Sequence, residues 1–317
     1  MQFAHLCQML ERIQETSGRL EITKQLADIF TQCEPHEAEI ISYLLLGQLR
    51  PTYYGTQFNV ARKGVEHIVS QVLDISHKAV KNQLQEVGDL GTVIAHGSWP
   101  VTRELSIEDV YNRLVTFEQI SGAGSQEEKS TYLQELLQDV SSQCAKYIVR
   151  IIVGKLRLGF SEMTIIDGLS WYLSGDKQHR DDIEYAFNRC ANIGKIARMI
   201  VAYGMSGLER IDITIGVPIR MAAAERAASL DAIMQRLGPC SVQPKLDGFR
   251  LQIHIQRNND EQVIHFFSRN LADMSEMFPD LKEALRYISH DSVIIEGEAI
   301  AYDEATDSYL SFQETVK

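Results

Sequence analysis

The chain has 317 residues, 44% of them hydrophobic, which suggests about two domains with buried cores. Its net charge of −12 argues against a broadly basic nucleic-acid surface, so any contact with DNA must come from local patches. Its apolar runs stay well short of the roughly 18 residues of a membrane span, and the N-terminus lacks a basic signal-peptide region. The five cysteines include no CxxC pair, so we expect a reducing, cytoplasmic environment and no zinc site.

Residues 1–202 are predicted to be helical throughout. Phe3, Leu6, Leu10 and Ile13 recur at helical spacing, and a break at 16–18 separates them from a second helix that ends before Pro35. Further helices are predicted over 36–47, 59–72, 76–86, 106–119, 127–139, 141–153, 161–173 and 181–202. No fixed period relates these segments, so the region is not predicted to be a solenoid.

The pattern changes after residue 202. Glycines and a proline mark a predicted linker over 203–220, and a short helix is predicted over 222–236. Leu251, Ile253 and Ile255 alternate with polar residues, which predicts a strand, and a turn at 258–260 leads to a second strand over 262–268. A helix over 277–287 and a strand over 293–302 follow, so residues 221–317 are predicted to mix helices and strands.

A short motif, Lys245-Leu246-Asp247-Gly248-Phe249-Arg250, stands just before the first predicted strand. A deprotonated lysine can attack phosphorus and hold a covalent intermediate, and an arginine guanidinium suits phosphate or carboxylate oxygens. The motif is therefore a candidate nucleotidyl-transfer site. A hairpin turn with a solvated lysine and arginine fits the same six residues.

Two acidic residues of the third predicted strand could complete such a site. Glu296 and Glu298 are two positions apart, so both carboxylates point to one face, where they could hold Mg²⁺ through oxygen. Nearby cations such as Arg250, Arg269 and magnesium would favour loss of the proton from Lys245. Glu296 could equally be a solvated or hydrogen-bonded strand residue, and Arg269 could form a surface ion pair.

Three motifs occur in a fixed order, namely 245–250, then Phe267-Ser268-Arg269-Asn270, then Glu296-Gly297-Glu298-Ala299. This series resembles motifs I, III and IIIa of the covalent nucleotidyltransferases, and most closely those of ATP-dependent DNA ligases. Residues 216–221 and 277–280 also resemble ligase segments, and residues 1–202 are similar to the all-helical DNA-binding domain of archaeal and eukaryotic-type ligases. The resemblance implies a multidomain fold, with an all-α N-terminal DNA-binding domain followed by a partial α+β nucleotidyltransferase domain (adenylation, ATP-grasp-like) over 221–317.

The resemblance also implies residue roles. Lys245 matches the nucleophile that becomes adenylated by ATP. Arg250 and Arg269 match arginines that contact the sugar and phosphate of the nucleotide, and Glu298 matches the acidic residue at the ribose and at Mg²⁺. Gln243 stands where many relatives carry a glutamate that reads the adenine amino group, and its side-chain carbonyl can accept the same hydrogen bond.

Candidate DNA contacts lie in the helical region. Residues 144–160 and 40–65 contain no acidic residue and carry Lys155 and Arg157 in the first stretch and Arg50 in the second. The loop with Gly122, Gly124 and Ser125 could present backbone N–H groups to phosphate, although a Gly/Ser loop is also a common plain connector. Such loops, and the turn at 156–159, contact the duplex backbone in the family. Contacts of this kind would not depend on the base sequence.

The resemblance predicts an ATP-dependent DNA ligase that seals nicks in duplex DNA during replication, repair and recombination. We expect a monomer, cytoplasmic and associated with the nucleoid, and a sliding clamp is left open as a further partner. In the family, Lys317 would fall within the adenylation domain, ahead of motifs IV and V and of an OB-fold domain bearing motif VI, so we expect this chain to be unable to seal DNA alone. A non-catalytic nicked-DNA-binding remnant is an alternative, and an RNA ligase or capping enzyme fits the lysine motif but not the helical domain.

His254 and His265 are expected to be exposed or hydrogen-bonded sheet residues rather than ligands.

Overall fold

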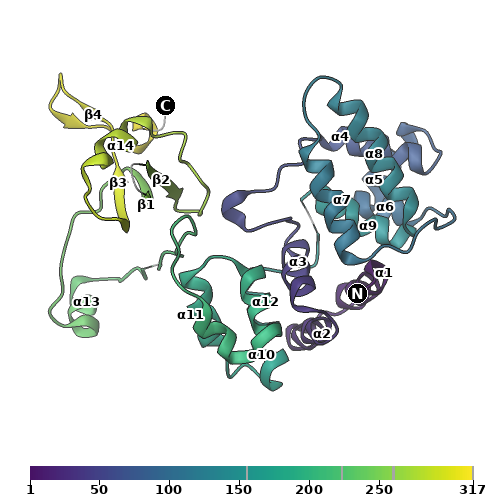
Figure 1. Cartoon of the computed structure of the whole chain (residues 1–317), viewed down its shortest axis with the longest axis horizontal. Coiled ribbons are helices and arrows are strands. Elements are labelled where there is room, and N and C mark those ends of the chain that lie inside the picture. The colour runs from purple at the N-terminus through teal and green to yellow at the C-terminus, as the bar shows by residue number, and fades with distance from the viewer. Residues whose placement is uncertain (155, 223, 259–260, 316–317) are drawn as a thin grey trace. The chain divides into compact units, whose positions relative to one another are not determined.

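The computed structural model describes residues 1–317 except 155, 223, 259–260 and 316–317. It divides into two compact units, which are described separately (Figure 1). The first unit contains residues 1–187 and 191–212, and the second contains residues 188–190 and 213–317. None of the helices in the described ranges is both long and apolar enough to cross a membrane.

Helices make up the first unit. Their bounds are α1 (Phe3–Gln14), α2 (Arg19–Thr31), α3 (Pro35–Leu45), η1 (Thr52–Tyr54), α4 (Arg62–Val72), α5 (His77–Val87), α6 (Leu90–Ala95), α7 (Ile107–Gln119), α8 (Ser125–Asp139), α9 (Ser142–Ile152), α10 (Glu162–Ser174), α11 (Arg180–Arg189), α12 (Ile193–Tyr203) and η2 (Gly204–Arg210).

Capping side chains set where several of these helices begin. The hydroxyls of Ser76, Ser106, Ser141 and Ser161 accept hydrogen bonds from backbone N–H groups in the first turns of α5, α7, α9 and α10. Such caps satisfy N–H groups that have no partner within the helix. The helix starts are therefore encoded locally.

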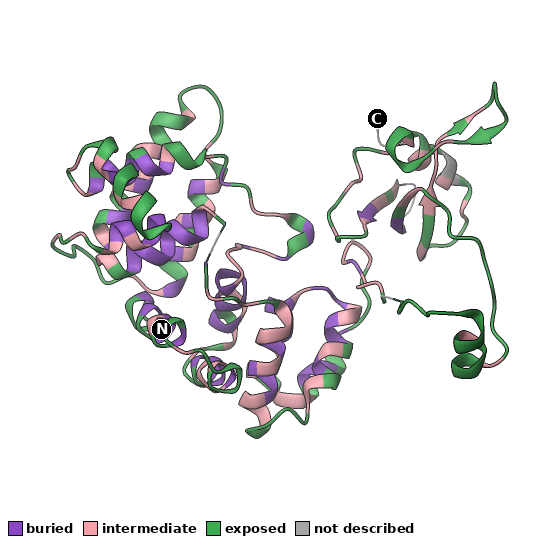
Figure 2. Ribbon diagram, turned by 180° about the vertical axis from the view of Figure 1, so that it is seen from behind, coloured by how far each residue is buried: buried purple, intermediate pink, exposed green. Residues whose placement is uncertain are grey.

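The helices of the first unit pack in two groups. In one group α4 packs on α8 and α5, and α6 packs on α9, whereas in the other α12 packs on α3 and α10 packs on α2. Helix α1 joins the groups by contacting α2, α7 and α9. The inward helix faces are buried, as the purple ribbon segments of Figure 2 show.

Two features of the first unit differ from the sequence prediction. The helix predicted over 181–202 is interrupted, because the Asn192 side chain accepts from the Lys195 N–H and starts α12 as a separate helix. Helix α6 was not predicted. It has only six residues, too few for a clear helical period, and begins at the capping side chain of Asp89.

The second unit is built on a three-stranded antiparallel sheet in the order β2-β1-β3. The strands are β1 (Phe249–Asn258), β2 (Glu261–Ser268) and β3 (Ser292–Ala299). Ile253 pairs with Phe266 on one side and with Ile295 on the other, and these side chains belong to a core on one face of the sheet. The remaining elements are α13 (Leu230–Leu237), α14 (Pro279–Ala284), η3 (Leu285–Tyr287), β4 (Tyr302–Asp303), β5 (Ser308–Tyr309) and α15 (Phe312–Thr315).

Some boundaries in the second unit also differ from those predicted. The helix predicted over 222–236 is α13, which begins only at Leu230, after the cap Ser229, and has no buried residue (Figure 2). The strand predicted over 293–302 ends at Ala299. Two residues of the predicted turn, 259 and 260, lie outside the described residues. The order of an all-α unit and then an α+β unit confirms the predicted fold class.

Candidate functional site

The loop before β1 carries two of the predicted ligand-binding side chains. Gln243 and Lys245 lie in a stretch without regular secondary structure, and both are exposed. Neither side chain has a hydrogen bond or ion pair within the part of the chain that the structure describes. The Lys245 ammonium is thus accessible to an incoming ligand.

Gly248 holds the end of this loop against strand β3. Its N–H donates to Glu298 Oε1 at 3.2 Å. A Cβ at this position would lie 2.4 Å from Ile300 Cγ1 and 2.6 Å from the backbone oxygen of Ala299, so only glycine allows the approach. Because consecutive Cα atoms are ~3.8 Å apart, the Cα of Lys245 lies within about 11 Å of the Cα of Gly248. The end of the loop, three residues after the lysine, is therefore fixed against Glu298.

Two other residues of the lysine motif connect it to α15. The carboxylate of Asp247 accepts the Phe312 N–H at 3.4 Å. The ring of Phe249 stacks on that of Phe312, with 6.2 Å between the ring centroids. Asp247 and Phe249 therefore have structural roles in the second unit.

Arg250, Glu296 and Glu298 share the sheet face opposite the core. In the β1–β3 register Arg250 lies opposite Glu298, and Gln252 lies opposite Glu296. Arg250 Nη2 is 2.5 Å from Glu296 Oε2, and the two side chains are 45% and 40% exposed. The structure thus brings Arg250 and Glu298 together on one face, and it makes Glu296 an ion-pair partner of the arginine.

Arg269 lies one residue beyond the last β1–β2 pair, Leu251 with Ser268. It follows β2 in a turn where the Leu271 N–H donates to the Ser268 oxygen at 2.8 Å. Its side chain is exposed, and the surface ion pair considered from the sequence is absent among the described residues. Arg269 therefore presents a solvated cation at the end of β2.

Gln252, which the sequence analysis did not single out, lies on the site face of β1 together with His254. Both are buried, at 2% and 0% exposure, because the segment before the sheet covers them. The Gly216 N–H donates to His254 Nδ1 at 3.1 Å, so the neutral ring carries its proton on Nε2, 2.9 Å from Gln252 Oε1. Gln252 also exchanges hydrogen bonds with the Ile219 backbone at 2.7 and 3.0 Å and donates to Glu296 at 3.3 Å. The alternation of polar and apolar residues in β1 already indicates that these side chains share one face of the sheet with Arg250.

His254 is held in its neutral form. Burial, and then the nearby His265, lower the pKa of His254 to about 4. The Phe267 ring packs edge-on against the imidazole, with 4.9 Å between the ring centroids. His254 is therefore a hydrogen-bonded sheet residue, one of the two alternatives expected from the sequence.

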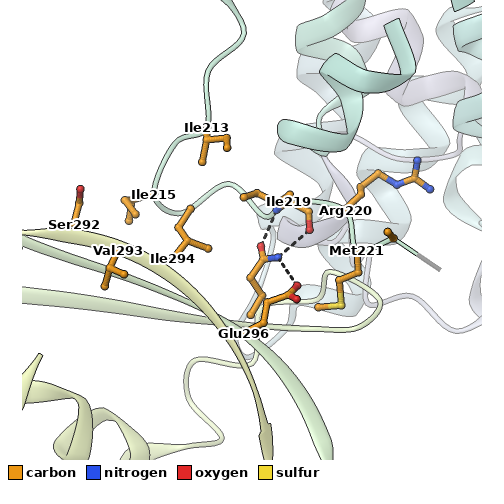
Figure 3. A pocket seen from close by; sticks show the side chains of 11 residues that line it. Ile213, Ile215, Ile219, Arg220, Met221, Ser292, Val293, Ile294 and Glu296 are labelled. Carbon is orange, nitrogen blue, oxygen red and sulfur yellow. Dashed lines mark hydrogen bonds between the residues drawn. The ribbon is translucent and has the colours of Figure 1, made fainter. Parts of the chain in front are cut away.

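The covering segment also forms one wall of a pocket of about 640 Å³. The hydrogen bonds of Gln252 to Ile219 and Glu296 lie at this pocket (Figure 3). Its lining is mostly apolar, with polar groups at Arg220, Gln252, Ser292 and Glu296. The pocket thus adjoins the Arg250–Glu296 ion pair on the same sheet face. Its apolar lining residues are Ile213, Ile215, Ile219, Met221, Ala222, Val293 and Ile294.

The donor set fits magnesium only as a site shared with a substrate. No group of three or more His, Cys, Asp or Glu side chains in the described ranges could hold a metal ion. Mg²⁺ commonly binds through one or two carboxylates together with substrate phosphates and water. Glu298 offers such a carboxylate, whereas Glu296 is occupied by Arg250.

The predicted glycine loop of the first unit leads directly into α8. Gly122 and Gly124 have φ of 98° and 82°, and Gly124 caps a helix whose first residue is Ser125. The two glycines are exposed. Glu127 and Glu128 follow in the first turn of α8. Their carboxylates would compete with a phosphate for the positive end of the helix dipole.

The predicted DNA-contacting arginines both have protein partners. Arg50 forms an ion pair with the largely buried Glu118 and is 34% exposed. Arg157, whose φ is 60°, donates through Nη2 to the Gly88 oxygen at 2.5 Å and remains 45% exposed. Lys155 lies outside the described residues.

Two further cations of the acid-free stretch 144–160 turn inward. Lys146 Nζ is 2.8 Å from Glu11 Oε1, and Arg150 Nη2 is 2.6 Å from Asp89 Oδ2. The side chains of Lys146 and Arg150 are only 6% and 4% exposed. Acidic partners from α1 and the cap of α6 therefore neutralise cations that look unpaired in the sequence.

Residues 2–170 match the family described as DNA ligase N terminus, and residues 221–317 match the family described as ATP dependent DNA ligase domain. The chain is 40% identical over 318 residues to a probable DNA ligase of Dictyoglomus turgidum, with 100% of this chain and 54% of the relative covered. It is 41% identical over 318 residues to a probable DNA ligase of Dictyoglomus thermophilum, with the same coverage. It is 33% identical over 326 residues to DNA ligase 2 of Thermofilum pendens, covering 98% of this chain and 54% of the relative. The chain thus spans about half the length of the curated relatives it matches.

Proposed function

Because the chain belongs to the ATP-dependent DNA ligase family, we propose that it supplies the duplex-binding unit and the reactive lysine of an enzyme that seals nicks in DNA. ATP and nicked duplex DNA are its substrates. The observation that carries this function is the placement of Arg250 opposite Glu298 on adjoining strands, directly after the loop that bears the exposed Lys245.

Lys245 is the nucleophile in this proposal. Its deprotonated Nζ attacks the α-phosphorus of ATP, a nitrogen–phosphorus bond forms, and the bond to pyrophosphate breaks. The AMP group then passes to the 5′-phosphate at the nick, which releases the lysine. The 3′-hydroxyl attacks that phosphate, a phosphodiester bond forms, and AMP leaves.

The neighbouring side chains bind and orient the nucleotide. Arg250 exchanges its partner Glu296 for an oxygen of the nucleotide, since the ion pair is partly exposed and such pairs are weak. Glu298 is held toward the lysine loop by Gly248 and accepts from the ribose. Arg269 contributes a cation for phosphate, and Gln243 accepts from the adenine amino group.

Magnesium would be held by Glu298 together with phosphate oxygens of the substrate. When bound, it supplies positive charge that stabilises charge on the transferred phosphoryl group.

In the first unit, the loop of Gly122, Gly124 and Ser125 and the cations Arg50, Lys155 and Arg157 contact the duplex backbone. These contacts are independent of base sequence, as nicks at any position require. A monomer working in the cytoplasm at the nucleoid is consistent with a DNA substrate, and a sliding clamp is a compatible partner. The non-catalytic remnant is not favoured, because residues 221–317 match the ATP dependent DNA ligase domain as well.

The test is formation of a covalent AMP adduct. The protein, continued to the full length of its relatives, is incubated with ATP and magnesium, and the adduct is located by mass spectrometry. We expect AMP on Lys245 in the unaltered protein and in Lys282→Ala, a matched control in the same unit whose ion pair with Glu276 lies at 3.1 Å. We expect no adduct and no nick sealing in Lys245→Ala. An undiminished adduct in Lys245→Ala would show that another residue is the nucleophile.

A further inference from the structure

A second pocket, of about 510 Å³, lies in the first unit, where the start of α3, helix α12 and η2 meet. None of its residues belongs to the candidate site or to the predicted DNA contacts. Its charged and hydrogen-bonding lining residues are Glu39, Asn192, Lys195, Arg198, Tyr203 and Arg210.

Cations outnumber carboxylates in this pocket. Lys195, Arg198 and Arg210 face a single acidic lining residue, Glu39, whose Oε2 lies 3.2 Å from Arg198 Nη1. Lys195 and Arg210 form no ion pair within the described ranges. Among the described lining residues, cations therefore exceed carboxylates by two, on a chain whose net charge is −12.

The walls of this pocket are held by tight packing. A Cβ at Gly194 would lie 2.4 Å from the ring carbon Cζ of Tyr43, so glycine lets α12 approach α3 closely. The Tyr43 hydroxyl, in turn, lies 2.8 Å from Asn192 Oδ1 and 3.1 Å from Glu39 Oε1. Helix α12, which carries Lys195 and Arg198, is thus packed closely against α3.

Two of the cations are placed to bind an anion. The Lys195 N–H donates to the capping Asn192 at 2.9 Å, so this lysine stands in the first turn of α12, where the helix dipole adds positive potential. The guanidinium of Arg210 lies over the Tyr203 ring, 4.0 Å from its centroid. Stacking orients the guanidinium plane and leaves its N–H groups free to donate at the edge.

We propose that this pocket binds a phosphate of the DNA backbone and extends the duplex contact of the helical unit beyond the glycine loop and Arg157. The inference rests on the proposed function, because DNA is the polyanion that the protein must hold. A phosphodiester offers oxygens to several donors at once, which matches cations arriving from α12 and η2. The phosphate would compete with the Glu39 carboxylate for Arg198.

The experiment compares Lys195→Gln/Arg210→Gln with Lys78→Gln/Lys81→Gln in the full 317-residue chain. The control residues are exposed lysines of α5, so both variants lose the same charge from the same unit. Binding of a nicked duplex is measured across a salt series. Loss of one phosphate contact lowers the slope of log K against log salt by about 0.9. We expect that change, and at least a fivefold loss of affinity at low salt, only in the pocket variant.

Glu39→Gln provides a test in the opposite direction. It removes the negative charge from the pocket while keeping an acceptor for Tyr43, so affinity for nicked duplex should rise by at least twofold. Glu86→Gln, an exposed residue of α5, is the matched control and should change affinity less. Thermal unfolding of each variant checks its fold, and Lys195→Gln alone replaces the double variant if the latter is unstable.

The outcomes separate the two proposals. If the unaltered chain does not bind nicked duplex, DNA binding by the helical unit fails and this inference fails with it. If the chain binds but the pocket and control variants behave alike, only the inference is overturned. A parallel titration with ATP identifies the source of the phosphate, since a loss of ATP affinity with unchanged DNA affinity would also overturn it.

Discussion

The backbone N–H of Gly248 donates to the carboxylate of Glu298 at 3.2 Å and so joins the lysine loop to strand β3. The contact connects residues that are 50 positions apart in the chain. It places the acidic side chain beside the loop of the proposed nucleophile, and it depends on the absence of a side chain at position 248.

Gly248→Ala is expected to destabilise the second unit by about 1–3 kcal/mol, because the added Cβ would meet backbone and packed side-chain atoms. Gly297→Ala is the matched control, since a Cβ there has no atom within 4 Å. Urea unfolding of the two variants measures the difference. Equal stabilities would mean that the loop does not approach β3 as closely as described.

The stability of the second unit is expected to fall in mild acid because of His254. The folded-state pKa of about 4 lies below the ordinary value, near 6.5, so the unfolded chain binds more protons between these values. The contribution of His254 to the free energy of unfolding is fully present above pH ~6.5 and is lost as the pH falls toward 4. The loss can reach about 3 kcal/mol at most.

Unfolding free energies measured from pH 7.5 to 4.5 provide the check on His254. His254→Gln should flatten this part of the profile. His290→Gln, which alters an exposed histidine of the same unit, should leave the slope unchanged. A slope that persists in His254→Gln would assign the pH dependence to other groups.

The buried ion pair of Arg150 with Asp89 is expected to be essential to the first unit. Burial raises the pKa of the Asp89 carboxyl, but hydrogen bonds from Arg150 and Thr92 outweigh it and hold that pKa below its usual value. Arg150→Ala leaves a buried carboxylate without its main partner and should cost about 3–5 kcal/mol. The control, Lys177→Ala, breaks the ion pair with Asp167. Because the Lys177 side chain is 49% exposed, this change should cost less than about 1 kcal/mol. Denaturant midpoints compare the two, and similar values would contradict the assigned burial.

Arg157→Gln should weaken binding of nicked duplex without changing any preference for base sequence. The residue is 45% exposed and stands at a turn with a positive φ, so its loss removes one cation from the proposed backbone contact. The salt slope should fall by about 0.9. Arg103→Gln, at a 68% exposed arginine in the same unit, serves as the control. Arg157 would lose its assigned role if both variants bound DNA equally well.

Much of the fold could be predicted because its signals are local. The apolar spacing of α1 and the serine caps of α5, α7 and α9 depend on residues within one or two helical turns. Helix α13 was predicted too long, because apolar and helix-favouring residues at 222–228 do not show where a capping serine will start the helix. The candidate site was predicted from the chemistry of the lysine motif, from the spacing of Glu296 and Glu298, and from the order of the motifs.

The partners of the charged residues could not be predicted in the same way. Lys146 and Arg150 lie in an acid-free stretch, yet Glu11 and Asp89 reach them from other helices. In the strand that follows the lysine motif, Gln252 and His254 occupy polar positions of a regular alternation, but residues 216–219 cover them. Alternation shows which side chains share a face but not what lies over that face.

The sequence by itself determined the family, the all-α and α+β order of the two units, and the identity of Lys245 as the candidate nucleophile, since these follow from local spacing and motif order. Only the tertiary structure decided that Glu298 meets Gly248, that Arg250 pairs with Glu296, and that cations from α12 and η2 converge on one pocket. The physical reason is that a charge or hydrogen bond acts over a few ångströms of space. Folding alone sets which residues, distant in the chain, come within that range.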